Sequence, residues 1–391
     1  MRMSWLIAFC LTVPTYLIFF IGKEPVMQGL AFSLYLIPIL VIVGRREYIK
    51  PSTAFIVTWV LFLILWVTPS LLNRMSDRLE SDLVSLPILA YHATVLTILL
   101  FTLTAYLQSE SKDRFGTLIR SIFWVMVPMA LLIIIKTVYL DTLSPSRPAP
   151  FGIHPNVAGE IILTFMLTAF WLRNRWLKAL VVILSITTAY LLESRGTLIS
   201  CFIGVAVAFA YPWMRQNITR RGLLVSLIGL IGVTLLFHEA ILLYGAKLLM
   251  MDTRLGGIAG RSEMYQLAIE GIFDRPILGN GFWVNPMLYA IPEQITHGAY
   301  LNNPANTIHN AFLRIASENG LGLTIFILGI ISMTTYRLLR DRAFTELAAL
   351  CAILFFLMFA TRHLTLNLMN VLLYMILIRG LLNASSPKSS P

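Results

Sequence analysis

Apolar residues occupy this chain in long, nearly uninterrupted runs rather than in alternating or 3.6-residue stripes. Most runs are roughly 20 residues long, the length that carries a helix across the hydrocarbon core of a bilayer. Breaks rich in charge, proline or glycine separate twelve such runs, near residues 4–21, 26–43, 53–72, 85–107, 119–140, 157–172, 178–193, 197–213, 222–240, 311–336, 347–361 and 364–382. Hydrophobic residues make up 58% of the chain and charged residues 13%, about half the charge of a soluble domain. The pattern therefore predicts an all-α polytopic membrane protein.

The charged residues between these runs predict the orientation of the chain. Five connections of one parity carry three cations each: Arg45, Arg46 and Lys50; Lys112, Arg114 and Arg120; Arg173, Arg175 and Lys178; Arg215, Arg220 and Arg221; Arg337, Arg340 and Arg342. Cytoplasmic loops collect Lys and Arg, so we expect these connections and both termini in the cytoplasm. The net charge of +11 then reflects topology and anionic lipids. No nucleic-acid partner is expected, because the cations form no single basic face.

One connection on the opposite side is much longer than the others. We divide the chain accordingly into spans one to nine (1–240), a large outer loop (241–310), spans ten to twelve (311–382) and a cytoplasmic tail (383–391). Within the loop, Met264, Leu267, Ala268 and Ile272 fall on one helical face of residues 261–273. This spacing predicts a helix lying along the membrane surface, followed by a turn at residues 274–281.

Outer arginines run against the charge bias and point to an anion site. Arg195 lies in a connection too short to leave the bilayer surface, where an arginine faces protein, water or an anion. Arg261 begins the predicted surface helix, and Arg254 and Arg275 bracket it. The planar guanidinium suits phosphate oxygens, and a lipid diphosphate is the natural anion at a membrane. The alternative for Arg195 is an ion pair with Glu193 or contact with lipid headgroups.

His309 is the candidate general base. It lies on the outer side just before the tenth predicted span, and imidazole has the pKa best suited to accept a hydroxyl proton at neutral pH. The alternative is a polar anchor or a helix-capping group. His154 and His297 also lie in outer loops, so the residue type alone does not choose among the three.

Three further polar residues are candidates for supporting roles. Glu318 is an intramembrane carboxylate, although Arg314, four residues earlier, is placed to neutralise it, and we favour that pairing. Asn156, at the start of the sixth span, either caps that helix or lines the site, and we favour capping. Asn310 follows His309 directly.

Several kinds of chemistry lack their usual residues. The chain contains no GxxxxGK[ST], HExxH or GxSxG motif, and no GxGxxG opening a soluble βαβ unit. Outer carboxylates are scattered without a DxD or a tight acidic pair, so we expect neither a metal nor another cofactor. Cys10, Cys201 and Cys351 lie in apolar runs and suggest packing rather than a disulfide or a metal site.

The motifs of the second half of the chain resemble the bacterial O-antigen ligase and polymerase superfamily. The resemblance rests on the order and spacing of five segments over residues 150–340: Ser194-Arg195-Gly196, Gly260-Arg261-Ser262, Pro276-Ile277-Leu278-Gly279-Asn280-Gly281, His309-Asn310 and Glu318-Asn319-Gly320-Leu321-Gly322. It implies an inner-membrane glycosyltransferase that uses an undecaprenyl-diphosphate-linked glycan on the periplasmic face. For a ligase the acceptor is the lipid A core oligosaccharide.

By position, the resemblance implies that Arg195 and Arg261 hold the donor diphosphate and that His309 is the base. Asn310, Glu318, Arg254 and Asn156 are expected to support them. We expect an O-antigen ligase that completes lipopolysaccharide. The alternatives are an O-antigen polymerase with the same donor and, as a different class, a transporter of a lipid-linked anion.

Overall fold

The computed structural model describes residues 2–21, 37, 53–75, 85–108, 114–143, 150, 155–210, 268–280, 310–358 and 368–382. The regular elements in these ranges are helical, and none of the described residues lies in a strand. The helices are α1 (Arg2–Ile21), α4 (Thr53–Met75), α5 (Ser85–Gln108), α6 (Arg114–Leu143), α7 (Pro155–Ala169), α8 (Arg175–Leu191), α9 (Arg195–Val205), the π-helix η4 (Ala206–Ala210), α14 (Ala311–Arg340), α15 (Phe344–Leu357) and α16 (Leu368–Leu382).

Ten of the twelve predicted spans coincide with described helices, usually within a few residues at each end. The span at 222–240 and all of the span at 26–43 except residue 37 lie outside the described residues, so the count of twelve stays a prediction. By length and apolar composition, two helices of the described part are able to cross a bilayer, Arg114–Tyr139 and Ala311–Arg340. The all-α class is confirmed for the residues that the structure describes.

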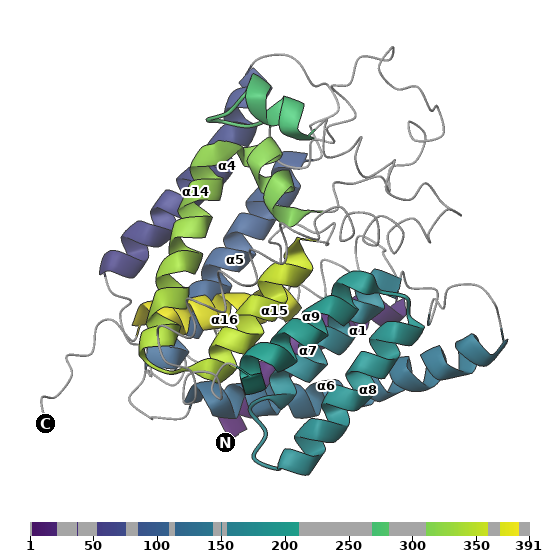
Figure 1. Ribbon diagram of the computed structural model, residues 1–391. Helices are drawn as coiled ribbons and strands as arrows, with labels where there is room; N and C mark the ends of the chain where they lie inside the picture. The colour runs from purple at the N-terminus through teal and green to yellow at the C-terminus, as the bar shows by residue number, and fades with distance from the viewer. Residues whose placement is uncertain are drawn as a thin grey trace, which may run out of the picture.

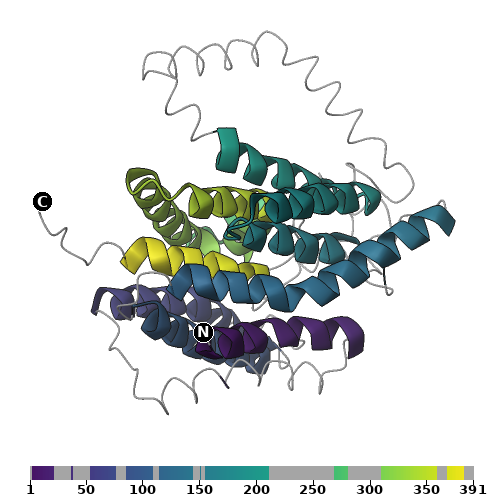
Figure 2. The same ribbon diagram turned by 90° about the horizontal axis from the view of Figure 1, so that it is seen from below.

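The helices pack in layers around one apolar core (Figures 1 and 2). In Figure 2, α1 lies on one side of α6, with α7, α8 and α9 on the other. Helix α9 packs against α15, α7 and α8, and α14 packs against α4, α16 and α15. Leu, Ile, Phe and Met side chains from these helices form a single buried cluster.

Helix α8 shows the pattern of a lipid-facing helix. Its outward face carries the exposed residues Leu180 and Ile183, with Trp176 (74% exposed) at one end and Tyr190 (69% exposed) at the other. Trp and Tyr concentrate where a membrane-spanning segment meets the headgroups at its two interfaces. The face therefore suits lipid with an aromatic residue at each boundary.

Helix α14 is broken near its start, which corrects the prediction of one continuous span at 311–336. Gly320 has φ 81° and ψ 172°, far from helical values, so residues 311–319 and 321–340 are separate helical parts. Figure 1 shows the two parts meeting at a bend beside residues 268–280. Residues 321–340 are 20 residues long, about 30 Å as a helix, so this part alone has the length of a bilayer core.

Candidate functional site

Arg195 is presented by a tight turn between α8 and α9. The N–H of Ser194 donates to the Ala189 carbonyl oxygen (3.2 Å) and the N–H of Glu193 to the Tyr190 carbonyl oxygen (2.9 Å), the pair of bonds that defines a Schellman motif. This motif needs a left-handed residue after the helix, and Glu193 takes that place with φ 51°. The reversed chain then begins α9 at Arg195.

The residue before Arg195 joins α9 to α7. Ser194 precedes the first helical residue of α9, but its side chain caps no N–H of that helix. Its hydroxyl instead donates to Oδ1 of Asn156 (3.3 Å) and is hydrogen-bonded to the hydroxyl of Thr197 (2.8 Å). A Cβ on Gly159 would overlap the Thr197 hydroxyl, so only glycine allows α7 this close to α9. The start of α9 is thus joined to α7 by one side-chain hydrogen bond and by close packing at Gly159.

The expected capping role of Asn156 is therefore wrong. Helix α7 begins at Pro155, so Asn156 is a residue of its first turn, and its amide oxygen contacts Ser194 of another helix. Asn156 is thus hydrogen-bonded to Ser194, the residue directly before Arg195.

The geometry around Arg195 suits an anion. The Arg195 side chain is exposed, and its backbone opens an 11-residue helix. The N-terminus of a helix carries partial positive charge on its first N–H groups, and a guanidinium adds a full charge at the same place. An exposed guanidinium and the start of a helix are both groups that favour phosphate oxygens.

Sequence reasoning missed Glu160, a buried carboxylate (5% exposed) in the same neighbourhood. It lies one helical turn after Asn156 on α7, next to Gly159, which contacts Ser194 and Thr197. The signal was available, because a carboxylate inside a predicted span is a functional candidate by its position alone. Glu160 therefore joins the candidate residues around the start of α9.

A second junction lies where α14 is broken. In a continuous helix the N–H of Leu321 would donate to the carbonyl oxygen of Ser317. Here the Leu321 N–H donates to the Pro276 carbonyl oxygen (2.7 Å), and the Ser317 carbonyl oxygen accepts from the Asn280 backbone N–H (2.9 Å). Residues 276–280 thus satisfy both groups that the break sets free.

Two glycines allow this contact between main chains. Gly279 (φ 64°) and Gly320 (φ 81°) both have left-handed backbones. A Cβ on Gly279 would lie 2.5 Å from the Glu318 carbonyl group, and a Cβ on Gly320 would overlap the Ile277 carbonyl oxygen. The two glycine-containing motifs, which sequence analysis treated separately, therefore interlock. A helix is confirmed over residues 268–274, with a turn after it up to residue 280. The position of this helix along the membrane surface stays a prediction.

The first part of α14 has defined ends and a neutralised charge. Asn310 is its N-cap, with Oδ1 accepting from the N–H groups of Phe312 (3.0 Å) and Leu313 (3.1 Å). Nε of Arg314 lies 2.8 Å from Oε1 of Glu318, which confirms the expected pairing of that buried carboxylate. Asn310 and Glu318 thus have structural contacts beside their candidate roles.

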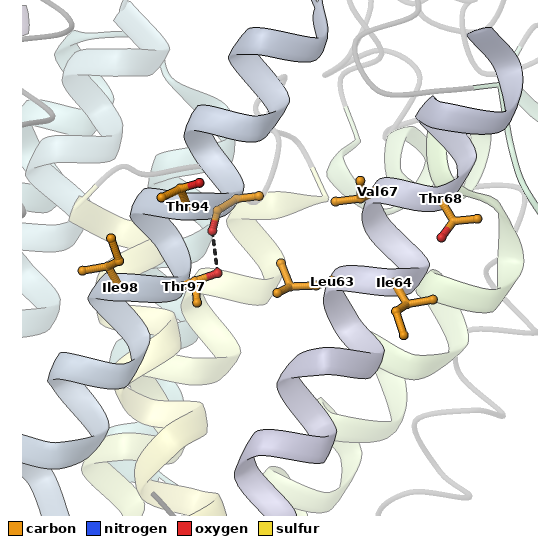
Figure 3. Close-up of a pocket in the computed structure, with 8 residues that line it drawn as sticks. Leu63, Ile64, Val67, Thr68, Thr94, Thr97 and Ile98 are labelled. Carbon is orange, nitrogen blue, oxygen red and sulfur yellow. Dashed lines mark hydrogen bonds between the residues drawn. The ribbon is translucent and has the colours of Figure 1, made fainter. Parts of the chain in front are cut away.

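A groove of about 510 Å³ lies elsewhere, between α4 and α5 (Figure 3). It is lined by Leu63, Ile64, Val67, Thr68, Ala93, Thr94, Thr97 and Ile98. The hydroxyl of Thr97 donates to the Ala93 carbonyl oxygen. None of the predicted site residues lines this groove, which is apolar apart from three threonines.

The remaining predicted site residues, Arg254, Arg261 and His309, lie outside the described residues. Their roles stay predictions.

Comparison with known families gives a match to residues 179–328, for the model described as O-antigen ligase. This match supports placing the chain in the O-antigen ligase and polymerase superfamily. The matched segment begins in α8, ends in α14 and includes Arg195, Arg261 and His309. No curated protein matches the chain.

The proteins described by this family model share a general activity. They are membrane proteins of a glycosyltransferase-like ligase and polymerase family. They belong to lipopolysaccharide biosynthesis, with lipid-linked glycan and lipid A core as general partners. The apolar helices described here are compatible with that setting.

Proposed function

We propose that this protein is an O-antigen ligase of the bacterial inner membrane. It transfers glycan from undecaprenyl diphosphate to the lipid A core oligosaccharide on the periplasmic face, and so completes lipopolysaccharide. The observation that carries the proposal is the family match over residues 179–328, a segment that contains both proposed diphosphate-binding arginines and the proposed base.

Arg195 and Arg261 hold the donor diphosphate. As the bond to the anomeric carbon breaks, negative charge grows on the leaving diphosphate, and guanidinium groups already in place stabilise that charge most in the transition state. The exposed side chain of Arg195 at the start of α9 supports this role. Because arginine supplies fixed positive charge, the transfer proceeds without a metal ion.

His309 removes the proton from the acceptor. The acceptor hydroxyl oxygen attacks the anomeric carbon and forms the new glycosidic bond, while the bond from that carbon to the diphosphate oxygen breaks. The electron pair leaves with undecaprenyl diphosphate, and the hydroxyl proton moves to the His309 imidazole. A single in-line displacement inverts the configuration of the anomeric carbon.

The charges at the two ends of α8 and α14 support a periplasmic site with cytoplasmic termini. Exposed Arg173 and Arg175 lie at the opposite end of α8 from Arg195, about 25 Å away along 17 residues. Arg337 and Arg340 lie in the last turn of α14, far from its Asn310 cap. Loops rich in cations stay in the cytoplasm, so Arg195 and Asn310 belong to the other face.

Exposed apolar side chains support contact between the outer loop and the membrane. Ile269 and Phe273 are exposed one helical turn apart on the loop helix, and Ile277 is exposed in the turn that follows it. Leu321 and Ile325 continue the exposed apolar surface on α14, directly after the Pro276 to Leu321 hydrogen bond. A surface helix at the headgroup boundary presents this kind of face to lipid.

Product analysis with purified protein tests the proposal. The protein is incubated with undecaprenyl-diphosphate-linked O-units and lipid A core, in EDTA and without nucleotide. We expect glycan attached to the core. Longer lipid-linked chains in place of this product mean that the protein is a polymerase.

The same incubation separates enzymes from transporters. Unchanged covalent species, together with movement of the lipid-linked donor across proteoliposomes, mean that the protein is a transporter. Product that forms only after a divalent metal is added contradicts the metal-independent mechanism. Protein with Arg195→Gln, in which we expect slower transfer, is assayed beside the wild type.

A further inference from the structure

The strongest feature that the proposed function leaves unused is the junction of residues 268–280 with residues 317–321, here called the Asn280 junction. It contains two of the five segments that carry the family resemblance, and neither of them supplies a proposed diphosphate ligand or base. Its residues instead form hydrogen bonds between the loop segment and α14.

Asn280 is the centre of this junction. Its side chain is buried (7% exposed), and Nδ2 donates to two carbonyl oxygens, those of Gly271 and Ser317, each at 3.0 Å. The first belongs to the helical segment 268–274 of the outer loop, and the second was set free by the break in α14. A primary amide is suited to this bridge because one nitrogen carries two donors. One side chain thus joins the loop helix to α14.

The backbone of residues 276–280 makes the same connection from both sides of the break. Its two main-chain hydrogen bonds replace the missing bond between Leu321 and Ser317, and the Gly279 and Gly320 contact leaves no space for a side chain. Loss of one partner would leave a buried polar group without a hydrogen bond, which is unfavourable. Hydrogen bonds and close main-chain packing therefore join the loop segment and the broken helix into one structural unit.

The chain leads from this unit to both proposed reacting segments. Arg261 is seven residues before Ala268, at the far end of the predicted surface helix. His309 directly precedes Asn310, which caps the part of α14 that ends in the junction. Each proposed reacting residue thus lies shortly before one of the two segments that the junction joins.

We propose that Asn280 is a positioning residue for the transfer reaction, which fixes the loop segment that follows Arg261 against the helix that follows His309. This inference rests on the proposed function. A displacement of about 1 Å between reacting groups can lower a rate about 100-fold. The junction sets this spacing without touching the substrate.

The test compares Asn280→Ala and Asn280→Asp with Asn174→Ala in the full-length protein. Asn174 caps α8 at the end opposite Arg195, where its side chain accepts hydrogen bonds from the N–H groups of Trp176 and Leu177. Asn174→Ala therefore also removes two hydrogen bonds made by an asparagine side chain, but it leaves the Asn280 junction intact. We expect kcat for glycan transfer to fall about 10- to 100-fold in both Asn280 variants and to stay within about twofold of wild type in Asn174→Ala, well below all melting temperatures. An equal loss of kcat in all three variants overturns the inference, and so does wild-type kcat in the Asn280 variants.

A covalent replacement of the bridge separates positioning from stability. A Cβ on Gly271 would lie 3.3 Å from Oγ of Ser317 and 2.9 Å from Nδ2 of Asn280. The double change Gly271→Cys and Ser317→Cys in the Asn280→Ala chain removes that close contact and brings two sulfurs within disulfide reach. Cys10, Cys201 and Cys351 are replaced by alanine. We expect oxidation to restore kcat and dithiothreitol to remove it again, and a disulfide that forms without restoring kcat overturns the inference.

Hydrogen–deuterium exchange tests the junction independently of any measurement of glycan transfer. In Asn280→Ala, the peptides covering residues 276–280 and 317–321 should exchange faster, while those from α7 and α9 exchange as in wild type. Unchanged exchange at the junction overturns the inference. Wild-type protein that transfers no glycan defeats the proposed function and the positioning role together, whereas loss of kcat in the Asn280 variants of an active enzyme concerns the junction alone.

Discussion

The hydroxyl of Ser194 donates to the amide oxygen of Asn156, 3.3 Å away, and so joins the start of α9 to the start of α7. Serine at this place would ordinarily cap its own helix. Its use between helices keeps Arg195 at a fixed point beside α7 and leaves the first N–H groups of α9 without a side-chain cap from Ser194. The packing of α7 on α9 thereby fixes the position of the Arg195 backbone, from which the proposed diphosphate-binding side chain extends.

Gly159→Ala tests this packing. The added methyl would overlap the Thr197 hydroxyl and lie 2.8 Å from Oγ of Ser194, so we expect the free energy of unfolding to fall by about 1–3 kcal/mol. The measurement is thermal unfolding in detergent. Gly329→Ala is the matched control, because its Cβ meets nothing within 4 Å and alanine favours a helix by about 1 kcal/mol. Equal melting temperatures for the two variants would contradict the close contact.

Glu193 has a left-handed backbone that glycine adopts without strain. We expect Glu193→Gly to be more stable than Glu193→Ala by about 1 kcal/mol, since both lose the carboxylate and only alanine keeps a Cβ at φ 51°. Chemical unfolding of the two variants measures the difference. An alanine variant as stable as the glycine variant would show that the turn after α8 relaxes away from this conformation.

Gly320→Ala tests the break in α14. Both the left-handed backbone and the overlap with the Ile277 carbonyl oxygen oppose a side chain, so we expect a loss of about 2–4 kcal/mol. The control is Gly322→Ala, two residues later, where the nearest atom to a new Cβ is 3.6 Å away. Thermal unfolding, with limited proteolysis of the outer loop, compares them. If both changes were tolerated equally, the main chains could not lie in the contact described.

The positions of the helices were predictable because each depends on a local run of apolar residues. The pairing of Arg314 with Glu318 was also predictable, since residues four apart share one face of a helix. The break at Gly320 was not, because Glu318-Asn319-Gly320-Leu321-Gly322 fits a helical pattern and the bonds that stabilise the break come from Pro276 and Asn280, about 40 residues away. Asn156 was misassigned for the same reason, because its partner lies in another helix.

Arg195 should depend on the shape of its side chain as well as its charge. Arg195→Lys keeps the charge but loses the planar fork, so we expect kcat/KM for the lipid-linked donor to fall about tenfold, with a larger fall in Arg195→Gln. Arg175→Lys is the matched control, because Arg175 lies at the other end of α8 over the Trp176 ring. Initial rates of transfer measure the effect. Equal rates for Arg195→Lys and wild type would argue against bidentate binding of the diphosphate.

His309→Ala, assayed for donor binding and glycan transfer in the same preparation, tests the central claim most directly. If His309 is the base and the arginines hold the diphosphate, the variant binds undecaprenyl-diphosphate-linked glycan as wild type does, melts at the wild-type temperature and transfers no measurable glycan to lipid A core. Transfer at the full wild-type rate by this variant would contradict the proposed mechanism.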